Sequence, residues 1–266
     1  MSPDEVFVTV AALVTGPALW ALWLWRLWRL PLRREGRAPR LAITNTLGIC
    51  ALLIYIVLRT AASFDVVGAP QYVFMYLVLG LAWVRVVETT FIVFGLSVRD
   101  DVVERRNQAA GAAVTGALVG ATLCYAGANI GDGPGWWVVV FSAGVATITW
   151  LLAWFTLAFF SPVADTVTVD RDRAAGLRLG ALLASWGLIL GRAVAGDWVS
   201  ADATVNEFVV LALPPVLLIL AVALVIEHRA RPNAERPQVA LLPWGVLPAA
   251  AYVAIAMAVV ARAGVP

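Results

Sequence analysis

Eight apolar segments, most of them about 20 residues or longer, constrain this 266-residue chain more than any other feature of its sequence. A helix needs ~20 consecutive, mostly apolar residues to cross a bilayer. Lipid cannot hydrogen-bond to backbone groups, so such segments form helices unless they alternate polar and apolar residues as barrel strands do. These segments do not alternate. We therefore predict an all-α integral membrane protein with eight transmembrane helices, at about residues 5–25, 41–60, 71–97, 109–128, 136–160, 176–195, 206–226 and 240–262.

The positive charges lie in alternate connections between these segments. The chain has no lysine, and fifteen of its nineteen arginines fall in the connections at 26–40, 99–106, 171–178 and 229–236. Cationic residues in short loops stay on the cytoplasmic side of a membrane. The spacing therefore predicts that these four connections are cytoplasmic and that both termini lie outside. Three arginines near the opposite ends of the segments can reach the interface with their long side chains: Arg59, Arg192 and Arg262.

An internal repeat is indicated in the middle of the chain. Residues 100–132 and 165–197 share eleven identities at an offset of 65, including an Ala-Ala-Gly opening and a Gly-Asp closing. Both copies enter the membrane from the predicted cytoplasmic side, so the two-helix repeat is parallel rather than inverted. The repeated helices carry small residues four positions apart, which lets helix backbones approach closely. We predict helix-packing roles, rather than hinge roles, for Gly116, Gly120, Gly176 and Gly180.

Part of this repeat resembles a known family. The pattern is an acid, five residues, and Asn-x-Ala-Ala leading into a glycine-rich helix, carried by Asp101, Asn107, Ala109, Ala110, Gly116 and Gly120, with a weaker echo in Arg173-Ala174-Ala175-Gly176. It is similar to the YjfL-like bacterial inner-membrane proteins, a domain of unknown function with a four-helix unit. The resemblance covers roughly 71–196 and departs from the family pattern at Arg106 and Gly111. It implies a multi-pass protein of the bacterial cytoplasmic (inner) membrane, and we treat residues 1–266 as one transmembrane bundle.

The composition argues against several classes of membrane protein. Without lysine there is no retinal Schiff base and no phosphate-binding P-loop lysine. The single histidine, His228, cannot supply paired haem ligands or a zinc cluster. Cys50 and Cys124 lie in separate segments and are expected to be buried apolar filler. The sequence thus predicts no metal, no cofactor, no catalytic residues and no nucleic-acid partner.

The sharpest candidate site is Arg85 with Glu88, near the middle of the 71–97 segment. A lone charge there costs at least ~2.5 kcal/mol. The two residues are three apart and share a helical face, so they can pair, and Thr89 and Thr90 could satisfy remaining donors. Two interpretations stay open: a buried ion pair that fixes the rotation of this helix, or a charge that lines an ion or solute path.

The first predicted cytoplasmic connection is strongly basic. We predict that it faces lipid or a partner through Arg33, Arg34, Arg37 and Arg40. The favoured function is a non-catalytic scaffold or accessory subunit of a membrane complex with a basic cytoplasmic face. Its expected partners are the lipid bilayer, anionic lipids, and other membrane subunits or further copies of the chain. The alternative is a small-ion or small-solute channel or transporter that uses Arg85 and Glu88.

Overall fold

The computed structural model describes residues 1–30, 37–233 and 239–264, and in these ranges the chain is helical with no strand. Among the described residues, eight helices are long and apolar enough to cross a membrane, as the apolar segments predict. Three contain a short irregular turn of helix and are named here by their parts. The eight are α1–η1–α2 (Pro3–Arg29), α3 (Arg37–Thr60), α5–η3 (Pro70–Phe94), α6 (Gln108–Gly127), α7 (Trp136–Phe160), α9 (Arg173–Ala193), α10 (Ala201–Arg229) and η5–α11 (Leu242–Ala263).

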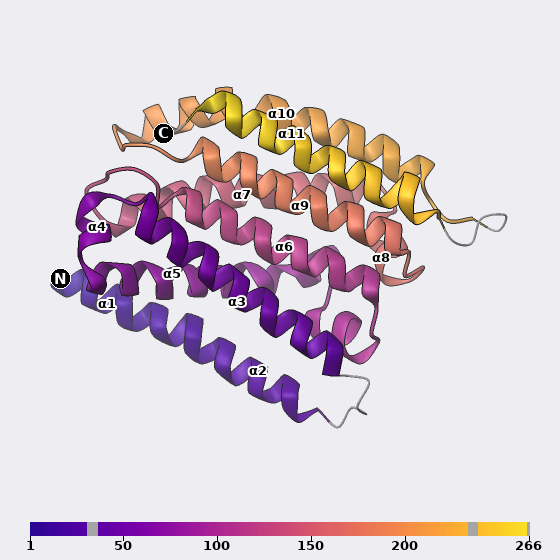
Figure 1. Ribbon diagram of the computed structural model, residues 1–266, viewed down its shortest axis with the longest axis horizontal. Coiled ribbons are helices and arrows are strands. Elements are labelled where there is room, and N and C mark those ends of the chain that lie inside the picture. The colour runs from indigo at the N-terminus through magenta and orange to yellow at the C-terminus, as the bar shows by residue number, and fades with distance from the viewer. Residues whose placement is uncertain (31–36, 234–238, 265–266) are drawn as a thin grey trace.

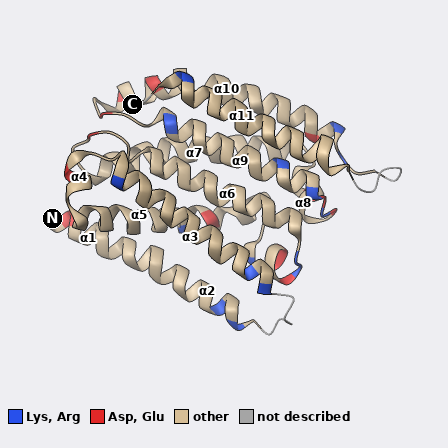
Figure 2. Ribbon diagram, viewed as in Figure 1, with Lys and Arg blue, Asp and Glu red and all other residues tan. Residues whose placement is uncertain are grey.

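The spans lie side by side, and successive spans run in opposite directions (Figure 1). An even number of spans brings the N- and C-termini to the same end of the bundle (Figure 1). Arginines gather at the other end (Figure 2). In the described parts of the connections between spans, three short helices are present: α4 (Phe64–Gly68), η4 (Val98–Glu104) and α8 (Val163–Thr168).

Helices α6 and α9 form the centre of the bundle. They are the most buried spans, with 72 % and 78 % of their apolar windows inside the protein. Each of the four glycines singled out in the sequence lies at their contact. A methyl group on Gly116 would overlap the backbone of Gly180, and one on Gly176 would overlap the backbone of Ala109. Such close approach is available only where a side chain is missing, and it maximises dispersion between two backbones.

The two central helices begin with equivalent caps. The Asn107 side chain accepts hydrogen bonds from the amides of Ala109 and Ala110, and the Asp172 side chain accepts one from the amide of Ala175. Each cap follows an arginine with a left-handed backbone, at φ 53° in Arg106 and φ 55° in Arg171. Asn107 and Asp172 are 65 residues apart, as are Arg106 and Arg171, and this is the offset of the internal repeat. Asn107 also donates to the Val167 carbonyl at 2.7 Å, which ties the start of α6 to α8.

The glycine-rich connection at 131–135 lies in the turn between α6 and α7. The Gly131 amide donates to the Ala61 carbonyl at 3.4 Å, and the Asp132 amide to the Asp197 carboxylate at 2.8 Å. Gly131 has φ 100°, a conformation that favours glycine. The backbone amide of Gly131 thus has its hydrogen-bond acceptor within the protein.

Candidate functional site

Arg85 and Glu88 form an ion pair within α5. The Arg85 guanidinium donates to the Glu88 carboxylate, one helical turn away. Their side chains are 18 % and 11 % exposed, so the pair is largely enclosed. The closeness expected from their spacing is therefore present, and each charge has its counter-charge on its own helix.

Helix α2 (Leu19–Arg29) covers this pair with an aromatic side chain. The Trp20 ring lies 5.1 Å from the Arg85 guanidinium carbon, a cation–π distance. Trp20 also donates through Nε1 to the Leu81 carbonyl at 3.1 Å. The tryptophan therefore fixes α2 against α5 at the level of the ion pair.

The hydroxyl groups of the two threonines beside the pair do not donate to it. Thr89 and Thr90 donate to the carbonyls of Val86 and Val87, one turn back on their own helix. The expectation that they satisfy leftover donors of Arg85 therefore does not hold for these hydroxyls. Arg85 Nε is buried and has no hydrogen-bond partner among the described residues.

A second ion pair, between Arg178 and Glu227, is more deeply buried and joins two spans. Arg178 on α9 donates from Nε and Nη2 to the two carboxylate oxygens of Glu227 on α10, at 2.8 and 2.7 Å. The side chains are only 1 % and 3 % exposed. This two-pronged geometry is the strong form of an arginine–carboxylate contact.

Arg178 also reaches the last span. Its Nη1 donates to the backbone carbonyl of Trp244 in η5 (Leu242–Val246). In a regular helix that carbonyl would accept from the amide four residues on, but residue 248 is proline, which has no N–H. The Arg178 guanidinium supplies a donor to this carbonyl instead. One guanidinium thus compensates the carboxylate of α10 and donates to a backbone carbonyl of the last span.

The sequence does not predict this second pair. Arg178 belongs by its position to the basic connection at 171–178, whereas in the structure it lies five positions inside α9 (Arg173–Ala193) and is buried. Glu227 lies beside His228 near the end of α10, and it too is buried. The available signal was the helix start: with Asp172 as the cap, Arg178 falls more than one turn inside the helix, on an apolar stretch.

The basic connection after α2 is described only in part, because Arg33 and Arg34 lie outside the described residues. Arg37 is exposed at the start of α3. Arg40 is buried: its Nη2 donates to the Leu30 carbonyl at 2.8 Å and its guanidinium lies 5.9 Å from the Trp28 ring. Arg40 therefore holds the start of α3 against the end of α2, which leaves Arg37 as the exposed member of the described pair.

Comparison of the chain with models of protein families, with curated proteins and with solved structures found no match. The resemblance to the YjfL-like family over 71–196 stays a prediction. Among the described residues no group of three or more His, Cys, Asp or Glu side chains could hold a metal ion. The fold and the two ion pairs therefore carry the functional argument.

Proposed function

We propose that the chain is a non-catalytic scaffold or accessory subunit of a membrane complex, in the bacterial cytoplasmic membrane, with both termini outside and a basic cytoplasmic face. One observation carries the proposal. The central helices α6 and α9 touch backbone to backbone at Gly116 and Gly180, which leaves no room for a water-filled path between them. The charges at membrane depth are also paired, so each is compensated without a passing solute.

The proposed partners follow from the surface. The apolar helices contact the lipid bilayer. The arginine-rich end suits anionic lipid head groups or acidic surfaces of other membrane subunits. The outer helices expose large apolar side chains, which could contact further copies of the chain. The corresponding caps at Asn107 and Asp172 support a parallel repeat at 100–132 and 165–197 within the single bundle.

The proposed orientation can be tested with single cysteines. The native thiols, Cys50 and Cys124, are both buried and can be replaced by alanine. Cysteines introduced at Glu104 and Asp170 are expected to react with a membrane-impermeant maleimide only after the cells are permeabilised, since both positions are exposed at the arginine-rich end. A cysteine at Phe64, which is 91 % exposed, is expected to react in intact spheroplasts. Labelling in the reverse pattern would overturn the orientation.

The alternative function is a small-ion or small-solute channel or transporter that uses Arg85 and Glu88. The observation that favours it is Arg85 Nε, a buried donor without a partner among the described residues. Against it, the carboxylate that Arg85 faces is on its own helix, and Trp20 covers the guanidinium. We therefore regard this pair as a device that fixes the rotation of α5.

A double substitution separates the two functions. Replacing Arg85 with leucine and Glu88 with glutamine removes both charges together, so neither is left unpaired. For a scaffold, the double variant is expected to copurify from native membranes with the same stoichiometric partners as the unmodified protein. Proteoliposomes of the unmodified protein should also pass protons and chloride no faster than empty liposomes. A flux that the unmodified protein supports and the folded double variant loses would refute the scaffold proposal.

A further inference from the structure

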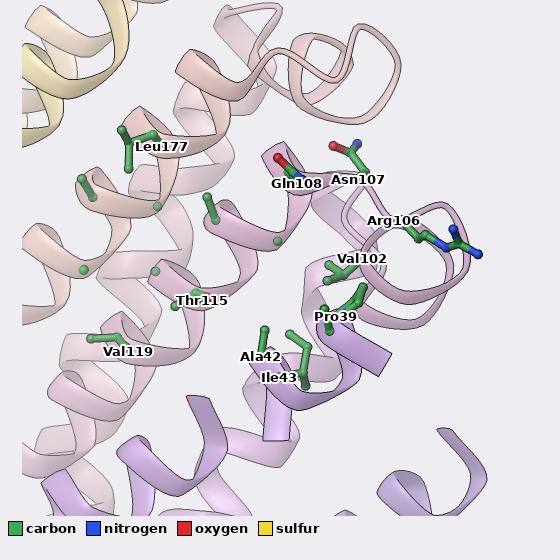
Figure 3. Close-up of a pocket in the computed structure, with 17 residues that line it drawn as sticks. Pro39, Ala42, Ile43, Val102, Arg106, Asn107, Gln108, Thr115, Val119 and Leu177 are labelled. Carbon is green, nitrogen blue, oxygen red and sulfur yellow. The ribbon is translucent and has the colours of Figure 1, made fainter. Parts of the chain in front are cut away.

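Two cavities between the described helices differ in their chemistry. Small and apolar side chains line the wide groove beside α6 for most of its length, including Ile43, Val119 and Leu177 (Figure 3). A second cavity, of about 50 Å³, is lined mainly by polar groups, and we call it the polar cavity. Its lining includes Ser63 and Val66, in and beside α4, so it lies at the end of the bundle opposite the arginines (Figure 2).

Three elements each contribute a buried polar side chain to the polar cavity: Tyr76 of α5, Asn129 of the turn after α6, and Ser142 of α7. The hydroxyls of Ser142 and Tyr76 form no hydrogen bond with a described residue, although their residues are only 3 % and 6 % exposed. Asn129 Nδ2 donates to the Tyr125 carbonyl at 2.8 Å, which leaves its Oδ1 as an acceptor. Buried polar groups normally have partners, so these oxygens are available to a ligand in the cavity.

A carboxylate completes the lining. Asp132 is the only Asp or Glu among the described lining residues. Its backbone is held in place, because its amide donates to the Asp197 carboxylate at 2.8 Å and its carbonyl accepts from the Trp198 amide at 2.7 Å. The Asp132 carboxylate itself forms no ion pair or hydrogen bond with a described residue. The cavity therefore combines one unpaired carboxylate with neutral oxygen atoms.

The charge around the polar cavity is negative. Asp65 and Asp197 lie beside lining residues, and both accept hydrogen bonds from neutral groups, a serine hydroxyl and backbone amides. Two arginines end neighbouring helices on this side, Arg59 and Arg192, and their guanidiniums donate to backbone carbonyls rather than to these acids. With Asp132, the three acids outnumber the two arginines. This balance complements a cation.

We propose that the polar cavity binds one Ca²⁺ ion, with the Asp132 carboxylate, the Asn129 amide oxygen and the hydroxyls of Ser142 and Tyr76 as its protein ligands. One water needs roughly 10–15 Å³ of such a cavity, so there is room for an ion with about two or three waters. Together these give about six or seven oxygen ligands, within the range that Ca²⁺ takes.

The ligand set favours Ca²⁺ over Mg²⁺. Ca²⁺ accepts mixed carboxylate, amide and water oxygens in flexible geometry, whereas Mg²⁺ requires near-octahedral geometry and loses its waters reluctantly. With a single carboxylate the expected dissociation constant is about 10⁻⁴–10⁻³ M, as in extracellular Ca²⁺ modules. The site needs no cluster of His, Cys, Asp or Glu, so the composition does not predict it. The inference goes beyond the proposed function, because a scaffold and a transporter could each contain such a site.

The test uses Tb³⁺, which occupies Ca²⁺ sites and emits light when a nearby aromatic side chain is excited. Tyr76 and Trp198 both line the polar cavity. The purified full chain is titrated with Tb³⁺ and then with Ca²⁺ or Mg²⁺ as competitor. Asp132→Asn and Ser142→Ala each remove one proposed ligand. Asp202→Asn is the matched control, because it removes one exposed carboxylate at the same end without changing the lining.

The unmodified protein and Asp202→Asn are expected to emit with Tb³⁺, to lose the emission to Ca²⁺ at lower concentration than to Mg²⁺, and to unfold at a higher temperature with Ca²⁺ present. Asp132→Asn and Ser142→Ala should bind about tenfold more weakly or worse, because each lacks an oxygen ligand. Both should unfold like the unmodified protein without Ca²⁺, which shows that they fold.

Three results would overturn the proposal. In the first, the two cavity variants keep the emission and the response to Ca²⁺. In the second, Asp202→Asn loses binding as strongly as Asp132→Asn, which would mean that Tb³⁺ is held by general surface charge. In the third, the unmodified protein responds to neither Tb³⁺ nor Ca²⁺, which would mean that the polar cavity holds only water.

Discussion

Replacing Arg178 with methionine is expected to lower the free energy of unfolding by about 3–5 kcal/mol, the usual loss when one partner of a buried ion pair is removed. The variant leaves the Glu227 carboxylate charged or forces it to bind a proton, in a place where it is 3 % exposed. It also removes the Arg178 donor from the Trp244 carbonyl, whose α-helical donor position is occupied by a proline, residue 248. Reversible unfolding in mixed micelles, followed by circular dichroism, measures the loss.

Two further variants identify the cause. Arg178→Met combined with Glu227→Leu removes both charges and should recover most of the stability, with a remaining loss of about 1–3 kcal/mol from the lost hydrogen bond to the Trp244 carbonyl. Arg173→Met is the matched control, since Arg173 is exposed one turn earlier on the same helix, and little change is expected. If Arg178→Met behaves like Arg173→Met, the pair is not a stabilising link between spans.

The two ion pairs solve the same problem in different ways. Arg85 meets its counter-charge on its own helix, so α5 can enter a membrane with the pair already formed. Arg178 and Glu227 are 49 residues apart and meet only when α9 and α10 pack. The second pair thus depends on assembly of the spans, and through Trp244 it also depends on the last of them. We therefore expect loss of the second pair to destabilise the protein more than loss of the Arg85 pair.

The eight spans could be predicted from the sequence because each depends on local composition. The 71–97 segment shows the limit of that approach. Its helical part ends at Phe94 and is followed by Gly95 in a left-handed conformation at φ 75°, a detail that hydropathy alone does not register. The pairing of Arg85 with Glu88 was also predictable, because their spacing places them on one face of a helix.

The rest of the candidate site depends on tertiary contacts. Arg178 follows Arg171 and Arg173 so closely in sequence that it was grouped with them, and only the packing of α10 separates a buried arginine from its exposed neighbours. Arg40 is a second example, since its burial depends on the Leu30 carbonyl at the end of the preceding span. A groove on the side of the bundle is likewise lined by α3, α6 and α9, which are far apart in sequence, and no local pattern specifies it.

The contact between α6 and α9 leads to the last prediction, that Gly116→Ala destabilises the protein by about 3 kcal/mol or more, at the upper end of overpacking losses. The new methyl group would overlap the carbonyl oxygen, the carbonyl carbon and the Cα of Gly180. All of these are backbone atoms, so no rotamer change relieves the overlap, and the two helices must move apart. Thermal unfolding of the purified protein, with the yield of folded monodisperse material, provides the measurement.

Gly144→Ala is the matched control, because it adds the same methyl group to a helical glycine with nothing within 4 Å. It is expected to be neutral or to stabilise the protein by about 0.5–1 kcal/mol, since alanine is the better helix former. Opposite effects of one methyl group at the two positions would tie the stability of the bundle to the backbone contact of α6 with α9. Equal tolerance at both positions would mean that the helices can separate freely, and the main argument against a path through the centre of the bundle would then be lost.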